Sequence, residues 1–294
     1  MMSPQISVVI ITLGRQTLYR LVSKLLNQEI SCEYEIILIS QSQLNEDLLQ
    51  DNKIEIFNKK PNLGYSYYRN LGIQHSKGDI IAFIDDDEEP MDEHWLDELT
   101  LPIITQKELV TTAGYHIPLG QGYLADSISF LGFPGGGFVG FETMWHVDER
   151  RYTRHICTGN LAIKKALLER LGGFDETLKH GSEDVYLGEI LVNNDIKIKY
   201  VGQATVFHDA RSGLVNIMKW NIRRGKSAYE LGKKKQIRSM HLKGRITSSI
   251  KILQKAIFTK YFPAVALLMV MQYFSQLLGY WIRQVSEANN KQSI

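Results

Sequence analysis

The first third of the chain alternates between continuous apolar runs and segments whose apolar residues recur at helical spacing. Ile6–Thr12 (ISVVIIT) and Ile80–Ile84 (IIAFI) have the length and composition of buried strands. The same patterns predict strands at Glu35–Ile39 and Ile54–Phe57, and helices at Tyr19–Gln28 and Ser66–His75. Strands and helices in this order predict an α/β fold with an open, mainly parallel sheet flanked by helices.

The second half is less regular. Gly132–Gly140 (GFPGGGFVG) is rich in glycine, so we expect a mobile loop that closes over a bound substrate. We expect regular structure to resume at Ile156–Ile163, followed by helices at Lys164–Leu171 and Glu183–Asn193 and by strands near Ile198–Val201 and Ala204–Phe207. The α/β pattern therefore continues beyond this loop.

An acidic run, Asp85 to Glu89, directly follows the predicted strand Ile80–Ile84. Ligands of open parallel sheets bind at the carboxyl ends of the strands. Neighbouring carboxylates repel one another, and the spacing of Asp85 and Asp87 lets both reach one cation and a bound diphosphate. Oxygen ligands suit Mg²⁺ or Mn²⁺. The alternative is a solvated acidic loop that only ends the strand.

Two further features carry candidate chemistry. His208 follows the predicted strand Ala204–Phe207, and imidazole is a good ligand for Mn²⁺, although a lone histidine more often has a structural place. Glu183 and Asp184 begin a predicted helix. Acids at that position either take part in catalysis or complement the positive end of the helix dipole.

Six segments, taken in order, resemble the family 2 glycosyltransferases of the GT-A fold over roughly residues 5–215. They are ISVVIITLGR, NLGYSYYRNLGIQHSKGDIIAFIDDDEEP, DEHWL, CTGNLAIKKALLERLGGFDE, GSEDVYLGEI and VFHDAR. The resemblance implies an inverting, metal-dependent transferase that moves a sugar from a nucleotide diphosphate donor to an acceptor hydroxyl. A sugar nucleotidyltransferase would need a glycine-rich signature with a lysine, which LGRQTLYR lacks. A non-catalytic sugar-binding scaffold remains the other alternative.

The resemblance also implies a role for individual residues. Asp184 matches the catalytic base, and Glu183 lies on the acceptor side. Asp87 and His208 match the ligands of Mn²⁺ or Mg²⁺. The positions that match donor-binding residues are Thr12, Arg15, Arg69, Asn70, Asp85, Asp86, Gly159 and Asn160.

The chain departs from the family pattern at two places. Ser40-Gln41-Ser42 stands where the family usually has an aspartate that reads the base, and Gly14 replaces an asparagine. A UDP-sugar is the expected donor, but these departures leave the identity of the base open.

Charge is distributed unevenly along the 294 residues. Residues 1–218 hold 19 Lys and Arg against 30 Asp and Glu, whereas residues 219–294 hold 15 against 2. We therefore expect a catalytic domain at 1–218 and a basic helical region with an apolar helix at 219–294.

The C-terminal region predicts an anionic partner. Tyr261–Ile282 is an uncharged segment of 22 residues, long enough to span a bilayer or lie on one, although a buried hairpin or an oligomer contact is the alternative. Arg223, Arg224 and Lys226 could pair with the donor diphosphate, a lipid-linked acceptor or headgroups, or form a solvated face. We expect a membrane surface and a glycan or lipid-linked acceptor as partners, and no nucleic acid.

The cysteine content and the first residues indicate the cellular compartment in which the protein works. The only cysteines are Cys32 and Cys157, too few for a disulfide framework, which favours a reducing compartment. The first residues lack the basic region and cleavage site of a secretory signal. The expectation is cell-surface or exopolysaccharide glycan synthesis at the cytoplasmic face of the cell membrane, with a peripheral or single-span attachment.

Overall fold

The computed structural model describes residues 4–45, 49–117, 120–131, 146–208, 213–234 and 249–292. The predicted loop Gly132–Gly140 lies outside these residues. The chain forms two compact units. The first comprises Met1–His116, Val147–Lys179 and Glu183–His208, and the second comprises Ile117–His146, His180–Ser182 and Asp209–Ile294.

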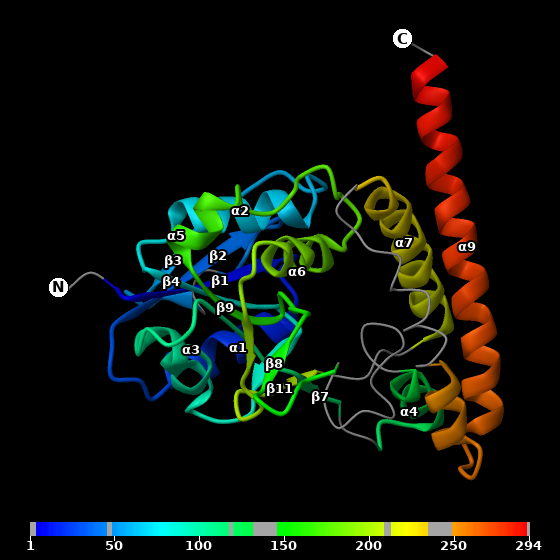
Figure 1. Cartoon of the computed structure of the whole chain (residues 1–294), viewed down its shortest axis with the longest axis horizontal. Coiled ribbons are helices and arrows are strands. Elements are labelled where there is room, and N and C mark those ends of the chain that lie inside the picture. The colour runs from blue at the N-terminus through cyan, green and yellow to red at the C-terminus, as the bar shows by residue number, and fades with distance from the viewer. Residues whose placement is uncertain are drawn as a thin grey trace. The chain divides into compact units, whose positions relative to one another are not determined.

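An eight-stranded sheet forms the centre of the first unit, in the order β3-β2-β1-β4-β9-β6-β10-β8 (Figure 1). Its strands are β1 (Ile6–Thr12), β2 (Tyr34–Ser40), β3 (Ile54–Asn58), β4 (Ile80–Ile84), β6 (Val110–Thr112), β8 (Tyr152–Thr153), β9 (Asn160–Lys164) and β10 (Ile198–Tyr200). β1 pairs parallel with β2 and β4, and β2 pairs parallel with β3, whereas β9 is antiparallel to β4 and β6. The expected open, mainly parallel sheet is confirmed.

Helices cover both faces of this sheet, which explains the continuous apolar strands. α1 (Gln16–Leu26) and α3 (Trp95–Ile104) pack on one face, and α2 (Tyr65–His75), α5 (Lys165–Arg170) and α6 (Glu183–Asn193) pack on the other (Figure 1). In β1, Val8 and Ile10 point into the α1 and α3 cluster, while Val9 and Ile11 point into the cluster of the opposite face. Because successive side chains of a strand alternate between faces, both sets must be apolar.

A second, three-stranded sheet brings distant segments to the end of β4. It consists of β5 (Glu88–Pro90), β11 (Val206–His208) and β7 (Tyr115–His116), in the order β5-β11-β7. β11 pairs antiparallel with β5, and the register places His208 opposite Glu88. The sequence pattern did not predict β5, because this strand has only three residues and two of them are acidic. This pairing carries His208 to the acidic run.

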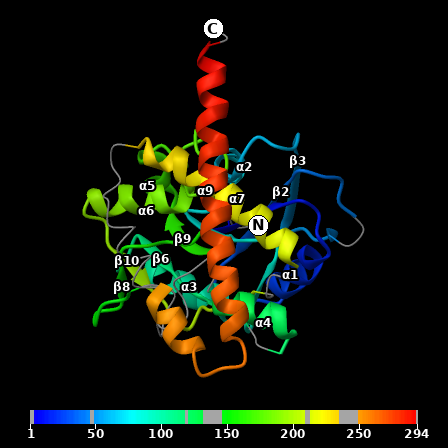
Figure 2. The same ribbon diagram turned by 90° about the vertical axis from the view of Figure 1, so that its right-hand side faces the viewer.

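The second unit is built from helices. Its elements are α4 (Tyr123–Phe130), α7 (Leu214–Gly232) and α9 (Phe262–Gln292). α7 crosses α9 and packs against it (Figure 2), and Ile217, Val265 and Leu268 belong to an apolar cluster that also includes residues of α4. The unit combines residues 117–146, 180–182 and 209–294, and the domain boundary at residues 218 and 219 that charge suggested stays a prediction.

Gly78 tests the packing of β1 against the turn before β4. A Cβ atom at this position would lie 2.7 Å from the backbone of Ile6 and Ser7. Gly78→Ala should therefore lower the free energy of unfolding by about 1–3 kcal/mol, measured by urea denaturation. Gly188→Ala in α6 is the matched control, because its Cβ would meet only ordinary contacts near 3.6 Å. Equal stability of the Gly78 variant and the wild type would contradict this packing.

Candidate active site

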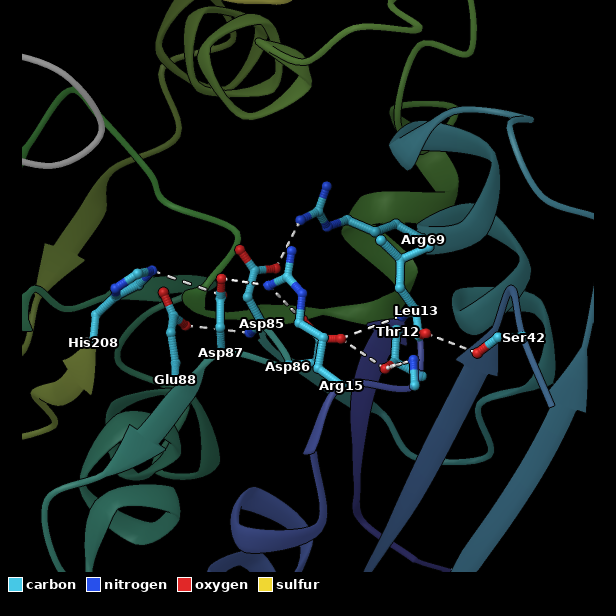
Figure 3. A network of polar contacts seen from close by, with 11 residues as sticks. Thr12, Leu13, Arg15, Ser42, Arg69, Asp85, Asp86, Asp87, Glu88 and His208 are labelled. Atoms are coloured by element: carbon cyan, nitrogen blue, oxygen red, sulfur yellow. Dashed lines mark hydrogen bonds and ion pairs between the residues drawn. The ribbon is translucent and has the colours of Figure 1, made fainter. Parts of the chain in front are cut away.

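The acidic run lies where the carboxyl ends of β1 and β4 meet. Asp86 is buried, and its Oδ2 accepts hydrogen bonds from Thr12 Oγ1 at 2.7 Å and from the Leu13 amide at 3.3 Å (Figure 3). Burial raises the pKa of Asp86, while Arg15 and Thr12 act to lower it. Asp86 therefore ties the loop that leaves β1 to the end of β4.

Arg15 holds two members of the acidic run together. Its Nη1 lies 3.2 Å from Asp86 Oδ1 and also pairs with Asp87 (Figure 3). The guanidinium is partly exposed. Arg15 thus offsets the repulsion between Asp86 and Asp87 and keeps one edge open to solvent.

A second guanidinium, Arg69 of α2, is buried beneath the run. It pairs with Asp85 at 3.0 Å and with Glu183 at the start of α6. Burial lowers the pKa of Arg69, but attraction to Glu183 and Asp85 outweighs burial and leaves the pKa raised. Arg69 is therefore a fixed positive charge that joins α2, β4 and α6.

Asp184 follows Glu183 in the first turn of α6. Its Oδ1 accepts the Val185 amide at 2.7 Å, and part of the residue's surface remains accessible. Burial of the carboxyl group, together with repulsion from Glu183, raises the pKa of Asp184 to about 7. A carboxylate that titrates near neutral pH suits a general base better than a mere helix-dipole partner.

His208, at the end of β11, faces Asp87, which lies in the turn between β4 and β5. His208 Nε2 lies 3.7 Å from Asp87 Oδ1, and the histidine is buried (Figure 3). The register between β5 and β11 fixes this approach. A nitrogen and an oxygen donor are therefore directed at the same point.

Glu88 is a site residue that the sequence reasoning did not single out. It is fully buried, its Oε2 accepts the Asp85 amide at 3.2 Å, and its Oε1 has no hydrogen-bond partner among the described residues. Burial, then repulsion from Asp85 and Asp87, raises the pKa of Glu88 well above its usual range. Gly159 makes room for it, because a Cβ there would overlap the Glu88 carboxyl group. Its position inside the acidic run was the available signal.

The donor set fits a divalent cation that a ligand completes. Within the described ranges, no group of three or more His, Cys, Asp or Glu side chains is arranged to hold a metal by itself. Asp87 and His208 supply two donors, and Mg²⁺-type sites commonly take their remaining ligands from water and substrate phosphates. The carboxyl groups near this point outnumber the two guanidinium groups; they belong to Asp85, Asp86, Asp87, Glu88, Glu183 and Asp184. The excess of acids favours a cation.

Two residues predicted to bind the donor have side chains bonded inside the protein. The Asn160 amide donates to the carbonyls of Gly114 and Ala204 at 3.0 and 2.7 Å, and its Oδ1 accepts from Trp95 Nε1. The Asn70 side chain accepts a hydrogen bond from the Phe174 backbone N–H at 2.8 Å through Oδ1, and it donates one to the Phe174 carbonyl at 2.9 Å through Nδ2. As placed, Asn160 and Asn70 support the sheet and the loop after α5, and their donor-binding roles stay predictions.

The two departures from the family pattern meet in space. Ser42 Oγ donates to the Leu13 carbonyl at 2.8 Å (Figure 3), and Gly14 has a φ of +75°. A Cβ at Gly14 would overlap Ser42 Oγ. The small residue at one position thus accommodates the hydroxyl at the other, next to the loop that Asp86 holds.

The sheet order and the acidic run after β4 agree with a fold of the GT-A type, and solved structures of glycosyltransferases share this fold. One is the mannosyltransferase PcManGT from Pyrobaculum calidifontis in complex with GDP-Man and Mn²⁺, with a TM-score of 0.60, 13% identity, and coverage of 97% of this chain and 87% of that one. Another is GalNAc-T7 with UDP, GalNAc and Mn²⁺, with a TM-score of 0.55, 15% identity, and coverage of 88% and 58%.

The model of glycosyl transferase family 2 matches residues 7–172, and the chain belongs to this family. The O-antigen biosynthesis protein RfbC of Myxococcus xanthus is 24% identical over 226 residues, which cover 70% of this chain and 17% of that protein. The hyaluronan synthase of Pasteurella multocida is 25% identical over 248 residues, which cover 72% and 25%. The chain therefore spans a quarter or less of the length of these relatives.

Arg69 should be essential for stability as well as for the site. Arg69→Met leaves Glu183 buried without its ion pair, so the free energy of unfolding should fall by about 3–5 kcal/mol in urea titrations. Adding Glu183→Gln should recover part of this loss, because the uncompensated charge is removed. Arg20→Met, which breaks an exposed ion pair with Glu89, is the control and should cost at most about 1 kcal/mol. Similar losses in both single variants would contradict the assignment.

Proposed function

We propose that the chain transfers a sugar from a nucleotide diphosphate donor to an acceptor hydroxyl, with inversion at the anomeric carbon and with a divalent cation held by Asp87 and His208. The observation that carries the proposal is the approach of His208 Nε2 to Asp87 Oδ1, 3.7 Å apart, beside the acid pair of α6. When bound, the cation supplies Lewis acidity that stabilises the charge of the departing diphosphate.

Asp184 is the proposed general base. A sugar hydroxyl is a poor nucleophile, and a positioned base that takes its proton contributes about 10²- to 10⁴-fold to the rate. The pKa of Asp184 near 7, which arises from burial and from Glu183, matches this task. Because the proposal uses one base and no covalent intermediate, the displacement is single and inverts the configuration.

The donor is proposed to lie over the carboxyl ends of β1 and β4. Open α/β sheets bind nucleotides at this edge. Asp86 and Arg15 order the loop after β1, and Arg69 orients Asp85, so these residues present a fixed surface to the nucleotide. The similar structures contain GDP-Man or UDP, which supports a nucleotide sugar. A UDP-sugar remains our expectation, and the contact between Gly14 and Ser42 lies where the base would be read.

The acceptor is proposed to be a growing or lipid-linked glycan at the cytoplasmic face of the cell membrane. The names of the relatives, an O-antigen biosynthesis protein and a hyaluronan synthase, support polysaccharide synthesis. In the described part of the chain, one helix, Phe262–Asn289, is long enough and apolar enough to cross a membrane.

Two variants separate the proposed roles of base and metal ligand. Asp184→Asn should lower the rate of sugar transfer by about 10²- to 10⁴-fold and leave donor affinity within about twofold, because only proton removal is lost. Asp87→Ala should abolish Mn²⁺-dependent donor binding. Transfer would be measured with a panel of nucleotide sugars, and binding by calorimetry. Asp195→Asn, an exposed change at a φ of 57°, which asparagine tolerates, is the control. Full transfer by Asp184→Asn would refute the base assignment.

The pH dependence follows from Asp184. Its deprotonated form is the active base and its pKa is about 7, so kcat/KM should rise with pH and be about tenfold below its plateau at pH 6. Glu183→Gln removes the repulsion that helps to raise this pKa, so the acid limb should move to lower pH. Initial rates between about pH 5 and 9, at saturating Mn²⁺, provide the measurement. A limb that stays in place in Glu183→Gln would show that another group titrates.

A further inference from the structure

α9 carries a stripe of exposed apolar side chains. The stripe consists of Leu267, Val270, Phe274, Leu277 and Trp281, whose exposed fractions are 62%, 66%, 65%, 70% and 60%. Their separations alternate between three and four residues, so all five lie on one face of the helix. An exposed apolar face of this length indicates an interaction surface.

The opposite face of α9 is buried, and its central part is polar, whereas Val265, Leu268 and Met269 on the preceding turns are apolar. Gln272, Ser275 and Gln276 are at most 8% exposed. Gln276 Nε2 donates to Asn221 Oδ1 of α7 at 2.8 Å. A helix of a water-soluble domain normally turns its polar side outward. Around Gln272, Ser275 and Gln276 α9 does the reverse, which is the arrangement of a helix whose outer face meets an apolar medium.

α7 fixes the orientation of the stripe. The helices touch at Gly225 and Gly279, where a Cβ atom on either glycine would overlap the backbone of the other helix. Ion pairs continue the contact, with Arg283 Nε 2.9 Å from Glu230 Oε1 and Lys233 paired with Glu287. α9 therefore cannot rotate to bury the stripe without breaking a close backbone contact and these ion pairs.

The charge around the stripe indicates what it meets. From residue 231 to residue 286 the sequence contains no Asp or Glu. The segment before α9 combines Lys255 and Lys260 with the exposed apolar side chains of Ile257 and Phe258, which are 51% and 96% exposed. Apolar side chains beside lysines fit an anionic lipid surface, because the apolar side chains enter the acyl chains while the lysines pair with the headgroups. A second copy of the chain would instead bring like charges together.

The partner helix indicates how α9 meets the lipid. α7 runs beside residues 276–287 of α9 and bears Arg223, Arg224 and Lys226. If α9 crossed a bilayer, this basic helix would be carried into the hydrocarbon core, which strongly disfavours charged side chains. A helix lying in the plane of the interface avoids this, because only its apolar face enters the lipid.

We propose that α9 docks flat on an anionic lipid surface through the stripe from Leu267 to Trp281, with α7 on its far side, and does not span the bilayer. The proposal goes beyond the reaction proposed above and rests on the second unit alone. Failure of the membrane experiment would leave the sugar-transfer proposal intact, and the reverse also holds.

Vesicle flotation of the full chain tests the stripe. Phe274→Glu/Leu277→Glu places acids on it, while Ser286→Glu/Asn289→Glu adds the same charge at exposed polar positions of the same helix that lie outside the stripe. With phosphatidylcholine vesicles containing phosphatidylglycerol, the wild type and the control should float, and the stripe variant should bind at least tenfold less. Phosphatidylcholine alone should bind all three weakly. Unchanged thermal melting and donor hydrolysis in the stripe variant would show that it is folded.

Three outcomes would overturn the proposal. The first is equal flotation of the stripe variant and the control. The second is a lipid-free dimer in sedimentation that the stripe substitutions convert to a monomer, which would make the stripe a contact between copies. The third is the protection of one tag when the chain carries a tag at each end and protease is added to one side of sealed membrane vesicles. An in-plane helix leaves both tags open to digestion, whereas a spanning helix protects one of them.

Discussion

Crowded carboxylates at the end of β4 are the constraint on which the site depends. They repel one another, and the protein answers with two guanidinium groups: Arg15 bridges Asp86 and Asp87, and buried Arg69 joins Asp85 to Glu183. Acids still outnumber these cations, so the cluster favours a divalent ion whose other ligands come from a diphosphate. The raised pKa of Asp184, caused by burial and by Glu183, has its origin in the same crowding.

The fold brings these charges together from distant parts of the sequence. Parallel β1 and β4 end side by side, so Thr12 reaches Asp86, and the pairing of β5 with β11 delivers His208 to Asp87. Glycine completes the arrangement, because Gly159 leaves space for the buried Glu88. The family relation and the GT-A fold agree with this geometry, and the proposed single displacement uses these side chains together with a divalent cation.

Much of this arrangement follows from local sequence patterns. β1, β4 and α6 have the predicted bounds because long apolar runs and a helical period are local signals, and the acidic run stands out as soon as β4 is located. Contacts between distant residues were not predictable. The partners of Asn160 are carbonyls at Gly114 and Ala204, Arg69 meets Glu183 through the tertiary fold, and the extent of the second unit depends on helix packing. The contact between Gln276 of α9 and Asn221 of α7 was likewise not predictable, because it depends on how the two helices pack.

The central claim is that the acidic cluster binds a cation and a sugar-bearing diphosphate together, and calorimetry of the wild-type chain tests it most directly. Nucleotide sugars would be titrated with and without Mn²⁺, and Mn²⁺ with and without the nucleotide sugar. We expect one donor at least to bind tenfold more tightly with Mn²⁺, and Mn²⁺ to gain the same factor from that donor, since such coupling is reciprocal. Absence of heat with every donor, or binding of each ligand unaffected by the other, would contradict the account.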